Sequence, residues 1–169
     1  LQEVLDAPYG SIDIPYYCNL CETCTVHCPK EFELADIFLK IRRDYYKDGE
    51  GPLKDHSPVT KFHQPLGTSG LFTLTKKDPS VDKTERLFFP GCSLSSYSPE
   101  VVVNTYKYIK DVMPGTGFLL RCCSAPTNML GQEDKFESKT EELVAEIKKT
   151  GAKELITACA DCTHTLINA

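Results

Sequence analysis

Nine cysteines constrain this 169-residue chain more than any other feature. The number is odd, so the cysteines cannot all pair as disulfides within one chain. Several are separated by only two residues, which is a typical spacing of metal ligands, and no signal-peptide pattern precedes them. We therefore expect metal ligation in a reducing compartment, in a cytoplasmic protein or one that faces the cytoplasm.

Composition excludes several other classes of protein. The chain is 41% hydrophobic and 25% charged, which is typical of a folded globular protein. Its net charge of −5 comes without a cluster of Lys or Arg, so nucleic-acid binding is not expected. No run approaches the roughly 18 consecutive apolar residues of a membrane-spanning helix, so none is predicted in this chain.

The pattern of residues divides the chain into three parts. Residues 1–48 carry four cysteines and apolar residues at helical spacing, namely Phe32, Leu34, Ile37, Phe38, Ile41 and Tyr45. Residues 49–85 are rich in Pro and Gly and are predicted to be a linker with one short strand at 71–75. Residues 86–169 form the third part. The chain starts at Leu1 and its last predicted helix, 161–169, has no capping signal, so we expect a truncated domain or a piece of a longer polypeptide.

Short apolar runs alternate with helical periodicity in residues 86–169. Strands are predicted at 86–90, 117–121 and 154–158, with helices over 99–113 and 135–150 between them. This alternation predicts a doubly wound α/β domain with a parallel sheet. The expected fold is therefore α/β, with a small helical module in front of this domain.

The first cysteine motif lies in the N-terminal part. Its sequence, Cys18-x2-Cys21-x2-Cys24-x3-Cys28-Pro29, resembles the cluster-binding run of bacterial ferredoxins, which implies a [4Fe–4S] cluster. A zinc site is the alternative, although zinc ligands usually come as two pairs with a long spacer. In two-cluster ferredoxins the last cysteine of the run binds the other cluster. Either a second run lies upstream of Leu1, which we favour, or Cys28 completes the same cluster.

The other five cysteines follow the predicted strands of the α/β part. Open α/β sheets bind ligands at the carboxyl ends of their strands, so these sulfurs are expected to meet at one edge and to bind a metal or cluster. Helices are expected to start near them and to favour thiolate anions. The alternative for any single one is a buried structural cysteine. The candidate metal ligands are Cys92, Cys122, Cys123, Cys159 and Cys162.

Three segments of this part resemble a known family. Phe89-Pro90-Gly91-Cys92, Cys122-Cys123-Ser124-Ala125-Pro126 and Cys159-Ala160-Asp161-Cys162 are similar to the cysteine-rich CCG domain of heterodisulfide reductase-like iron–sulfur subunits. In that family a helical ferredoxin module precedes the CCG domain, which often occurs twice in tandem. The resemblance implies a second iron–sulfur cluster, non-cubane in heterodisulfide reductase, or zinc at the five cysteines. Ser124 stands where the family has glycine.

The resemblance implies electron transfer in a multi-subunit oxidoreductase, with thiol or disulfide chemistry at the cysteine-rich site. Flavoprotein or iron–sulfur subunits are the expected partners, and a membrane subunit could anchor the complex. Two alternatives stay open: a zinc-binding scaffold module that passes electrons on, and a thiol switch without metal. No catalytic residue is assigned.

The four histidines are weaker signals. His164 follows Cys162 by two positions and is either an additional ligand or a surface residue. His27 is expected to tune solvation of the first cluster. His56 and His63 fall in the predicted linker and have no expected role.

Overall fold

The computed structural model describes residues 13–81 and 83–169 of the chain. These divide into two compact units. Unit 1 contains residues 13–62 and Pro126–Phe136, and unit 2 contains His63–Ala125 and Glu137–Ala169. No helix in the described ranges is both long enough and apolar enough to cross a bilayer.

Unit 1 is helical. It contains α2 (Asp13–Tyr16), α3 (Thr23–His27), α4 (Leu34–Lys47), the 3-10 helix η1 (Lys54–His56), most of η2 (Val59–His63) and most of α8 (Ala125–Met129). Its core is formed by Tyr16, Tyr45 and Leu130, with Ile41, Leu53 and Val59 packed around them. The predicted helical periodicity is therefore confirmed for the inward face of α4, whereas Phe32 precedes this helix and is exposed.

A buried arginine joins the segments of unit 1. The guanidinium group of Arg42, in α4, donates hydrogen bonds to the backbone carbonyl groups of Pro15, Cys18 and Met129. Its side chain also lies over the ring of Tyr16. A buried charge is tolerated only where its donors are satisfied, so Arg42 fixes the chain around Cys18 relative to α4.

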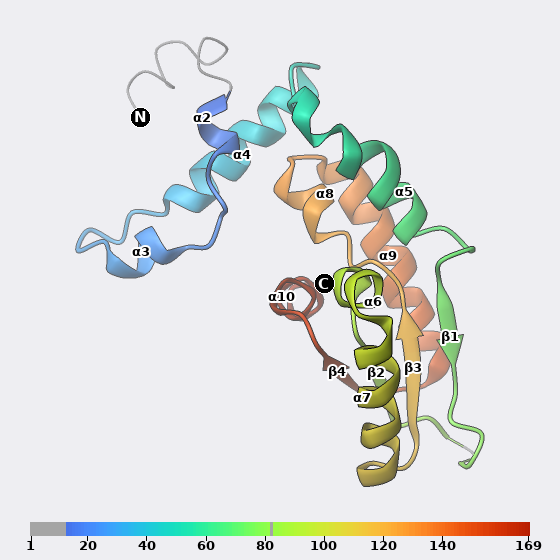
Figure 1. The fold of residues 1–169 in the computed structure, drawn as a ribbon. Coiled ribbons are helices and arrows are strands. Elements are labelled where there is room, and N and C mark those ends of the chain that lie inside the picture. Colours follow the sequence, from blue (N-terminus) through green and yellow to red (C-terminus); the bar gives the residue numbers. More distant parts are fainter. Residues whose placement is uncertain (1–12, 82) are drawn as a thin grey trace. The chain divides into compact units, whose positions relative to one another are not determined.

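Unit 2 is built on a four-stranded sheet. Along the chain its strands are β1 (Leu74–Lys76), β2 (Arg86–Phe89), β3 (Thr116–Leu120) and β4 (Glu154–Thr157), and their order in the sheet is β1-β3-β2-β4. β2 lies parallel to β3 and β4, while β1 is an antiparallel edge strand on β3 (Figure 1). In this register Phe88 lies opposite Phe118 and Ile156.

Helices cover both faces of the sheet. On one face, Phe88 packs with Val102 and Ile109 of α7 (Pro99–Val112). On the other, Leu87 and Phe89 form a core with residues of α9 (Glu133–Thr150) and α10 (Ala160–Ile167), including Leu143 and Cys162. Successive strand residues point to opposite faces, which explains this division. The prediction of an α/β fold with helices on both sides is confirmed.

The segment between the cysteine motifs has more structure than its composition suggests. Residues 49–85, predicted to be a linker, include η1, η2, α5 (Gln64–Gly67) and β1. The strand predicted at 71–75 begins at Leu74. Pro65 lies in the first turn of α5, where a helix loses no hydrogen bond to the missing N–H, so a proline there does not prevent a helix.

Candidate metal centre

The four cysteines of the N-terminal run lie on and around α3. Cys18 lies in the loop after α2, Cys21 just before α3, Cys24 within it, and Cys28 at its C-terminal cap. Cys21 and Cys24 are exposed, and Cys18 and Cys28 are half-buried. The run is thus an open loop and a single helical turn that present their sulfurs near the surface of unit 1.

Local hydrogen bonds reach three of these sulfurs and lower the pKa of two of them. The backbone N–H of Leu20, a residue with φ 54°, donates to the Sγ atom of Cys18 at 3.4 Å. The pKa of Cys21 is lowered, chiefly by a hydrogen bond with the Thr23 hydroxyl group. The pKa of Cys28 is also lowered, by backbone N–H groups of Phe32 and Lys30. Thiolates are the ligand form of cysteine, so these bonds suit metal binding.

The sulfurs of this run do not lie as close together as the ligand atoms of a single metal ion. Within residues 13–81 and 83–169, no three of its sulfurs lie within 4.8 Å of one another. A cluster of four irons holds its thiolates further apart than one ion does, so this spacing does not decide between an open loop and a cluster-binding loop. The [4Fe–4S] cluster at Cys18, Cys21, Cys24 and Cys28 stays a prediction.

The other five cysteines all lie just beyond the carboxyl ends of neighbouring strands. Cys92 follows β2 and is the first residue of α6 (Cys92–Tyr97). Cys122 and Cys123 lie between β3 and α8, and Cys159 and Cys162 lie at the N-cap and in the first turns of α10, after β4. β3, β2 and β4 are adjacent in the sheet, so the topology brings three distant parts of the sequence together where the carboxyl ends of these strands meet.

The five thiols form one continuous series of contacts. The Sγ atoms of Cys92 and Cys122 are 3.3 Å apart. Cys122 is hydrogen-bonded to Cys123, and Cys123 to Cys162. Cys162 is in turn hydrogen-bonded to Cys159. The structure therefore brings together all five residues that the strand-end argument selects, with Cys122, Cys123 and Cys162 buried and the other two half-buried.

Gly91 makes this close approach possible. Its φ of 77° lies in the region that residues with a side chain avoid. A Cβ atom added there would lie 2.9 Å from the Sγ atom of Cys162 and 3.6 Å from the Cβ atom of Cys159. Glycine is therefore required both by the backbone turn after β2 and by the space between β2 and α10.

The contacts between the thiols shift their pKa values in opposite directions. Hydrogen bonds from Cys122 and Cys162 lower the pKa of Cys123 to about 3. The pKa of Cys92 falls to about 6, mainly through its hydrogen bond with Cys122. The pKa values of Cys122 and Cys162 are raised, chiefly because each donates its proton to Cys123. Neighbouring thiolates repel one another, so a cation that replaces the protons shared by Cys122, Cys123 and Cys162 would favour their ionised forms.

Backbone N–H groups add to this preference for negative charge. The N–H of Ser124 donates to the Sγ atom of Cys122 at 3.4 Å, and the N–H of Ala125 donates to Cys123. The Thr165 hydroxyl group is a third donor, again to Cys123. These direct bonds matter more than helix dipoles here, because α6 and α8 have only six and five residues.

Ser124 has two unusual features. Its φ is 65°, which explains why glycine suits this position in the sequences that the motif resembles. Its side chain is fully buried, and its hydroxyl oxygen has no hydrogen-bond partner among the described residues. An unpartnered polar atom beside Cys123 is consistent with a site that holds a further group when loaded.

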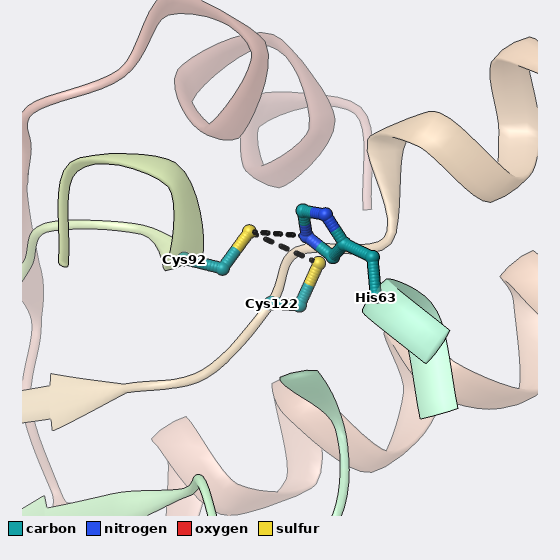
Figure 2. A group of neighbouring side chains, drawn as sticks. All are labelled: His63, Cys92 and Cys122. Carbon is teal, nitrogen blue, oxygen red and sulfur yellow. Dashed lines mark hydrogen bonds between the residues drawn. The ribbon is translucent and has the colours of Figure 1, made fainter. Parts of the chain in front are cut away.

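The structure adds two side chains that the sequence did not assign to the site. The Nε2 atom of His63, at the end of η2, lies 3.2 Å from the Sγ atom of Cys92 (Figure 2). The amide nitrogen of the buried Gln64 lies 3.7 Å from the Sγ atom of Cys122. The ligand atoms of His63, Cys92 and Cys122 all lie within 4.8 Å of one another. No local sequence signal marks His63, because its partners are distant in the sequence.

The remaining histidines lie elsewhere. His164 is exposed on α10, and His27 is exposed at the end of α3. The ring of His56 packs against Tyr16 in unit 1, with ring centroids 5.2 Å apart. Of these three, none belongs to a group of potential metal ligands within the described ranges.

The donor set fits a soft or borderline metal. Five thiols and one imidazole match the ligands of iron–sulfur centres and zinc, whereas magnesium and calcium require oxygen donors. The burial of three of the sulfurs and the N–H groups directed at them would stabilise such a centre.

Comparisons with known proteins agree with the family resemblance of the three cysteine-containing segments. Residues 86–167 match the family model of the CCG cysteine-rich domain. The chain is similar to proteins named as one subunit of dihydromethanophenazine:CoB–CoM heterodisulfide reductase, with 25% identity to that of Methanosarcina barkeri and 24% to that of Methanosarcina mazei. Each alignment covers 96% of this chain and 41% of the relative, so the chain spans less than half the length of these proteins. No solved structure matches it significantly.

Proposed function

We propose that this chain is an iron–sulfur electron-transfer subunit of a heterodisulfide reductase-like oxidoreductase complex, because its residues 86–167 match the CCG cysteine-rich domain and it resembles heterodisulfide reductase subunits. The observation that carries this proposal is the unbroken series of contacts among Cys92, Cys122, Cys123, Cys162 and Cys159. A purely structural role for buried cysteines would not require five thiols in one series of pairwise contacts beyond the carboxyl ends of the strands.

The five thiols would hold the second metal centre of the protein. Cys122, Cys123 and Cys162 would anchor it from the buried side, where the N–H groups of Ser124 and Ala125 stabilise negative charge. An iron–sulfur cluster bound there would exchange single electrons at a potential set by these hydrogen bonds and by burial. Cys92 and Cys159 are only half-buried, so a substrate thiol or disulfide would approach the centre from their side.

The N-terminal run would serve as the relay. Cys18, Cys21, Cys24 and Cys28 would bind a [4Fe–4S] cluster whose negative charge is partly offset by the buried Arg42 at the carbonyl group of Cys18. The exposure of Cys21 and Cys24 would leave this cluster close to the surface, where an electron partner can reach it.

A complex is part of the proposal. The relatives are named as subunits of an enzyme, and the chain covers 41% of their length. We expect a flavoprotein or another iron–sulfur protein as the electron partner, on the cytoplasmic side of the cell membrane. Thiol or disulfide chemistry would take place at the cysteine-rich site.

A zinc-binding scaffold module is the second candidate. One observation favours it: the ligand atoms of His63, Cys92 and Cys122 already lie close enough for one ion. In that case electrons would pass only through the N-terminal cluster.

Metal analysis of anaerobically purified protein tests the proposal. We expect iron and acid-labile sulfide in the wild type, with partial loss of both in Cys21→Ala and in Cys123→Ala, because each variant empties a different site. Combining the two substitutions should remove almost all iron. Zinc as the only metal would contradict the iron–sulfur assignment, and an unchanged metal content in Cys123→Ala would contradict a centre at the strand ends.

A further inference from the structure

We propose that His63 is a metal ligand of the cysteine-rich site and supplies the nitrogen donor at its Cys92–Cys122 end. The inference rests on the proposed function, because it requires a metal centre at the strand-end cysteines. It adds to that centre a residue from outside the domain match, which begins at residue 86.

The distances suit coordination of one metal atom by three residues. The Nε2 atom of His63 is 3.2 Å from the Sγ atom of Cys92, which is 3.3 Å from the Sγ atom of Cys122. Around a tetrahedral metal with the usual bond lengths, two thiolates lie about 3.8 Å apart, and a thiolate and an imidazole nitrogen about 3.5 Å. The two printed distances are therefore within about half an ångström of those in a tetrahedral site, and the third pair, His63 and Cys122, lies within 4.8 Å.

The segment that carries His63 is fixed to the cysteine loop. The backbone N–H of Cys122 donates to the carbonyl group of Gly67 at 2.9 Å. A Cβ atom at Gly67 would lie 3.0 Å from that of Cys122, so a larger residue would push α5 away. The Gln64 amide group adds its contact with the Cys122 sulfur. The contacts of Gln64 and Gly67 with Cys122 therefore hold the backbone of His63 close to Cys92, in addition to the contact that the imidazole itself makes.

The two ends of the series of thiols differ. The Cys123, Cys159 and Cys162 end has thiols and the Thr165 hydroxyl group as its side-chain neighbours in the series, whereas at the other end an imidazole contacts Cys92 and lies within 4.8 Å of Cys122. A metal at the His63 end has one nitrogen and two sulfur ligands from the protein, and a tetrahedral metal keeps a fourth position for an external thiol. Replacing a thiolate ligand by imidazole raises the reduction potential of iron–sulfur centres, so His63 also makes the centre easier to reduce.

Pulsed EPR with histidine variants tests this role. The anaerobically isolated holoprotein is compared with His63→Ala, His63→Cys and the matched control His164→Ala, whose histidine is exposed on α10. We expect hyperfine coupling to a histidine nitrogen in the wild type and in His164→Ala, and its loss in both His63 variants. Where the metal is zinc, Co²⁺ exchanged into the site provides the paramagnetic probe.

Metal content and reduction potential complete the test. His63→Ala should lose at least half of the metal that depends on Cys123, while His63→Cys should retain it and, with iron bound, show a lower potential. A wild type without histidine coupling, together with unchanged metal in His63→Ala, would overturn the ligand assignment and leave the proposed function intact. Absence of any metal that depends on Cys123 would overturn the proposed function itself. Circular dichroism checks that each variant is folded.

Discussion

The two groups of cysteines in this chain are assembled in opposite ways. Cys18 to Cys28 follow one another in a short loop and a single helical turn, and Cys21 and Cys24 are exposed. The strand-end group begins at Cys92 and ends at Cys162, and three of its five sulfurs are buried. The hydrogen bonds of the first group join residues close in sequence, whereas those of the second also join segments that follow different strands.

This difference predicts different sensitivities to changes in the protein. The N-terminal run depends on its own backbone and on Arg42, so substitutions in the sheet should leave it intact. The strand-end site shares its core with the sheet, because Cys123 and Cys162 pack with Leu87 and Phe89. Substitutions in that core should therefore act on metal binding and on folding together.

The largest effect is expected from Phe89→Ala. Phe89 is fully buried in the core that includes Cys123 and Cys162, so its truncation should cost about 3–5 kcal/mol of unfolding free energy. Chemical denaturation measures the loss, and metal analysis should show that the strand-end site empties first. The control is Phe32→Ala beside the N-terminal run, where the side chain is 45% exposed and a change within about 0.5 kcal/mol is expected. Equal losses of unfolding free energy in both variants would contradict the proposed difference between the two groups of cysteines.

A smaller but more local effect is expected from Gly91→Ala. The new Cβ atom would meet the Cys162 sulfur at 2.9 Å on a backbone with φ of 77°. We expect a loss of about 2 kcal/mol in stability and impaired metal binding at the strand ends only. Gly151→Ala, at φ 79° and with nothing within 4 Å of the added atom, is the matched control. Full metal binding in Gly91→Ala would show that the site tolerates a wider separation of β2 and α10.

Acid should weaken unit 2 through Asp78. Hydrogen bonds from Ser80 and Gly115 and the ion pair with Lys110 lower the pKa of this buried carboxyl group from 3.8 to about 2. The resulting stabilisation is fully present above about pH 4 and is lost as the pH falls towards 2, with a magnitude of about 1–2 kcal/mol.

Comparison with Asp78→Asn isolates this contribution. The variant should be less stable than the wild type at neutral pH, and the difference should shrink as the pH falls from 4 to 2. Denaturation curves at several pH values measure it. A difference that stays constant over this range would mean that the Asp78 charge contributes nothing.

The smallest effect is expected from Ser124→Gly, and it should be stabilising. Glycine relieves the strain of a side chain at φ 65° and removes a buried hydroxyl group without a partner among the described residues. We expect a gain of about 1 kcal/mol in thermal or chemical unfolding. A loss of stability instead would indicate that the hydroxyl group makes a bond in the loaded protein.

The sheet and its two long helices were predictable because their patterns are local. Strands predicted at 86–90, 117–121 and 154–158 correspond to β2, β3 and β4, and α7 and α9 lie where helical periodicity places them. The gathering of the cysteines followed from topology, since parallel strands present their carboxyl ends at one edge. The resemblance to heterodisulfide reductase-like subunits is confirmed by the domain match and the relatives.

The part of the site that was missed depends on tertiary contacts. His63, Gln64 and Gly67 lie in a segment whose Pro and Gly content is typical of loops, and α5 is only four residues long. Its position is set by the bond between Gly67 and Cys122, which no periodicity encodes. For the same reason β1 was misplaced by a few residues, because a three-residue edge strand has almost no pattern of its own.

The order of the strands has a consequence for synthesis of the protein. β2 lies between β3 and β4, so the edge that gathers the thiols is complete only after α10 has been made and packed. Contacts between residues so far apart in sequence form late in folding, whereas the hydrogen bonds to the Cys18 and Cys21 sulfurs join residues only two positions apart. The sulfurs of the N-terminal run are therefore neighbours from the moment that they are made, whereas the strand-end cysteines meet only once α10 has reached the sheet.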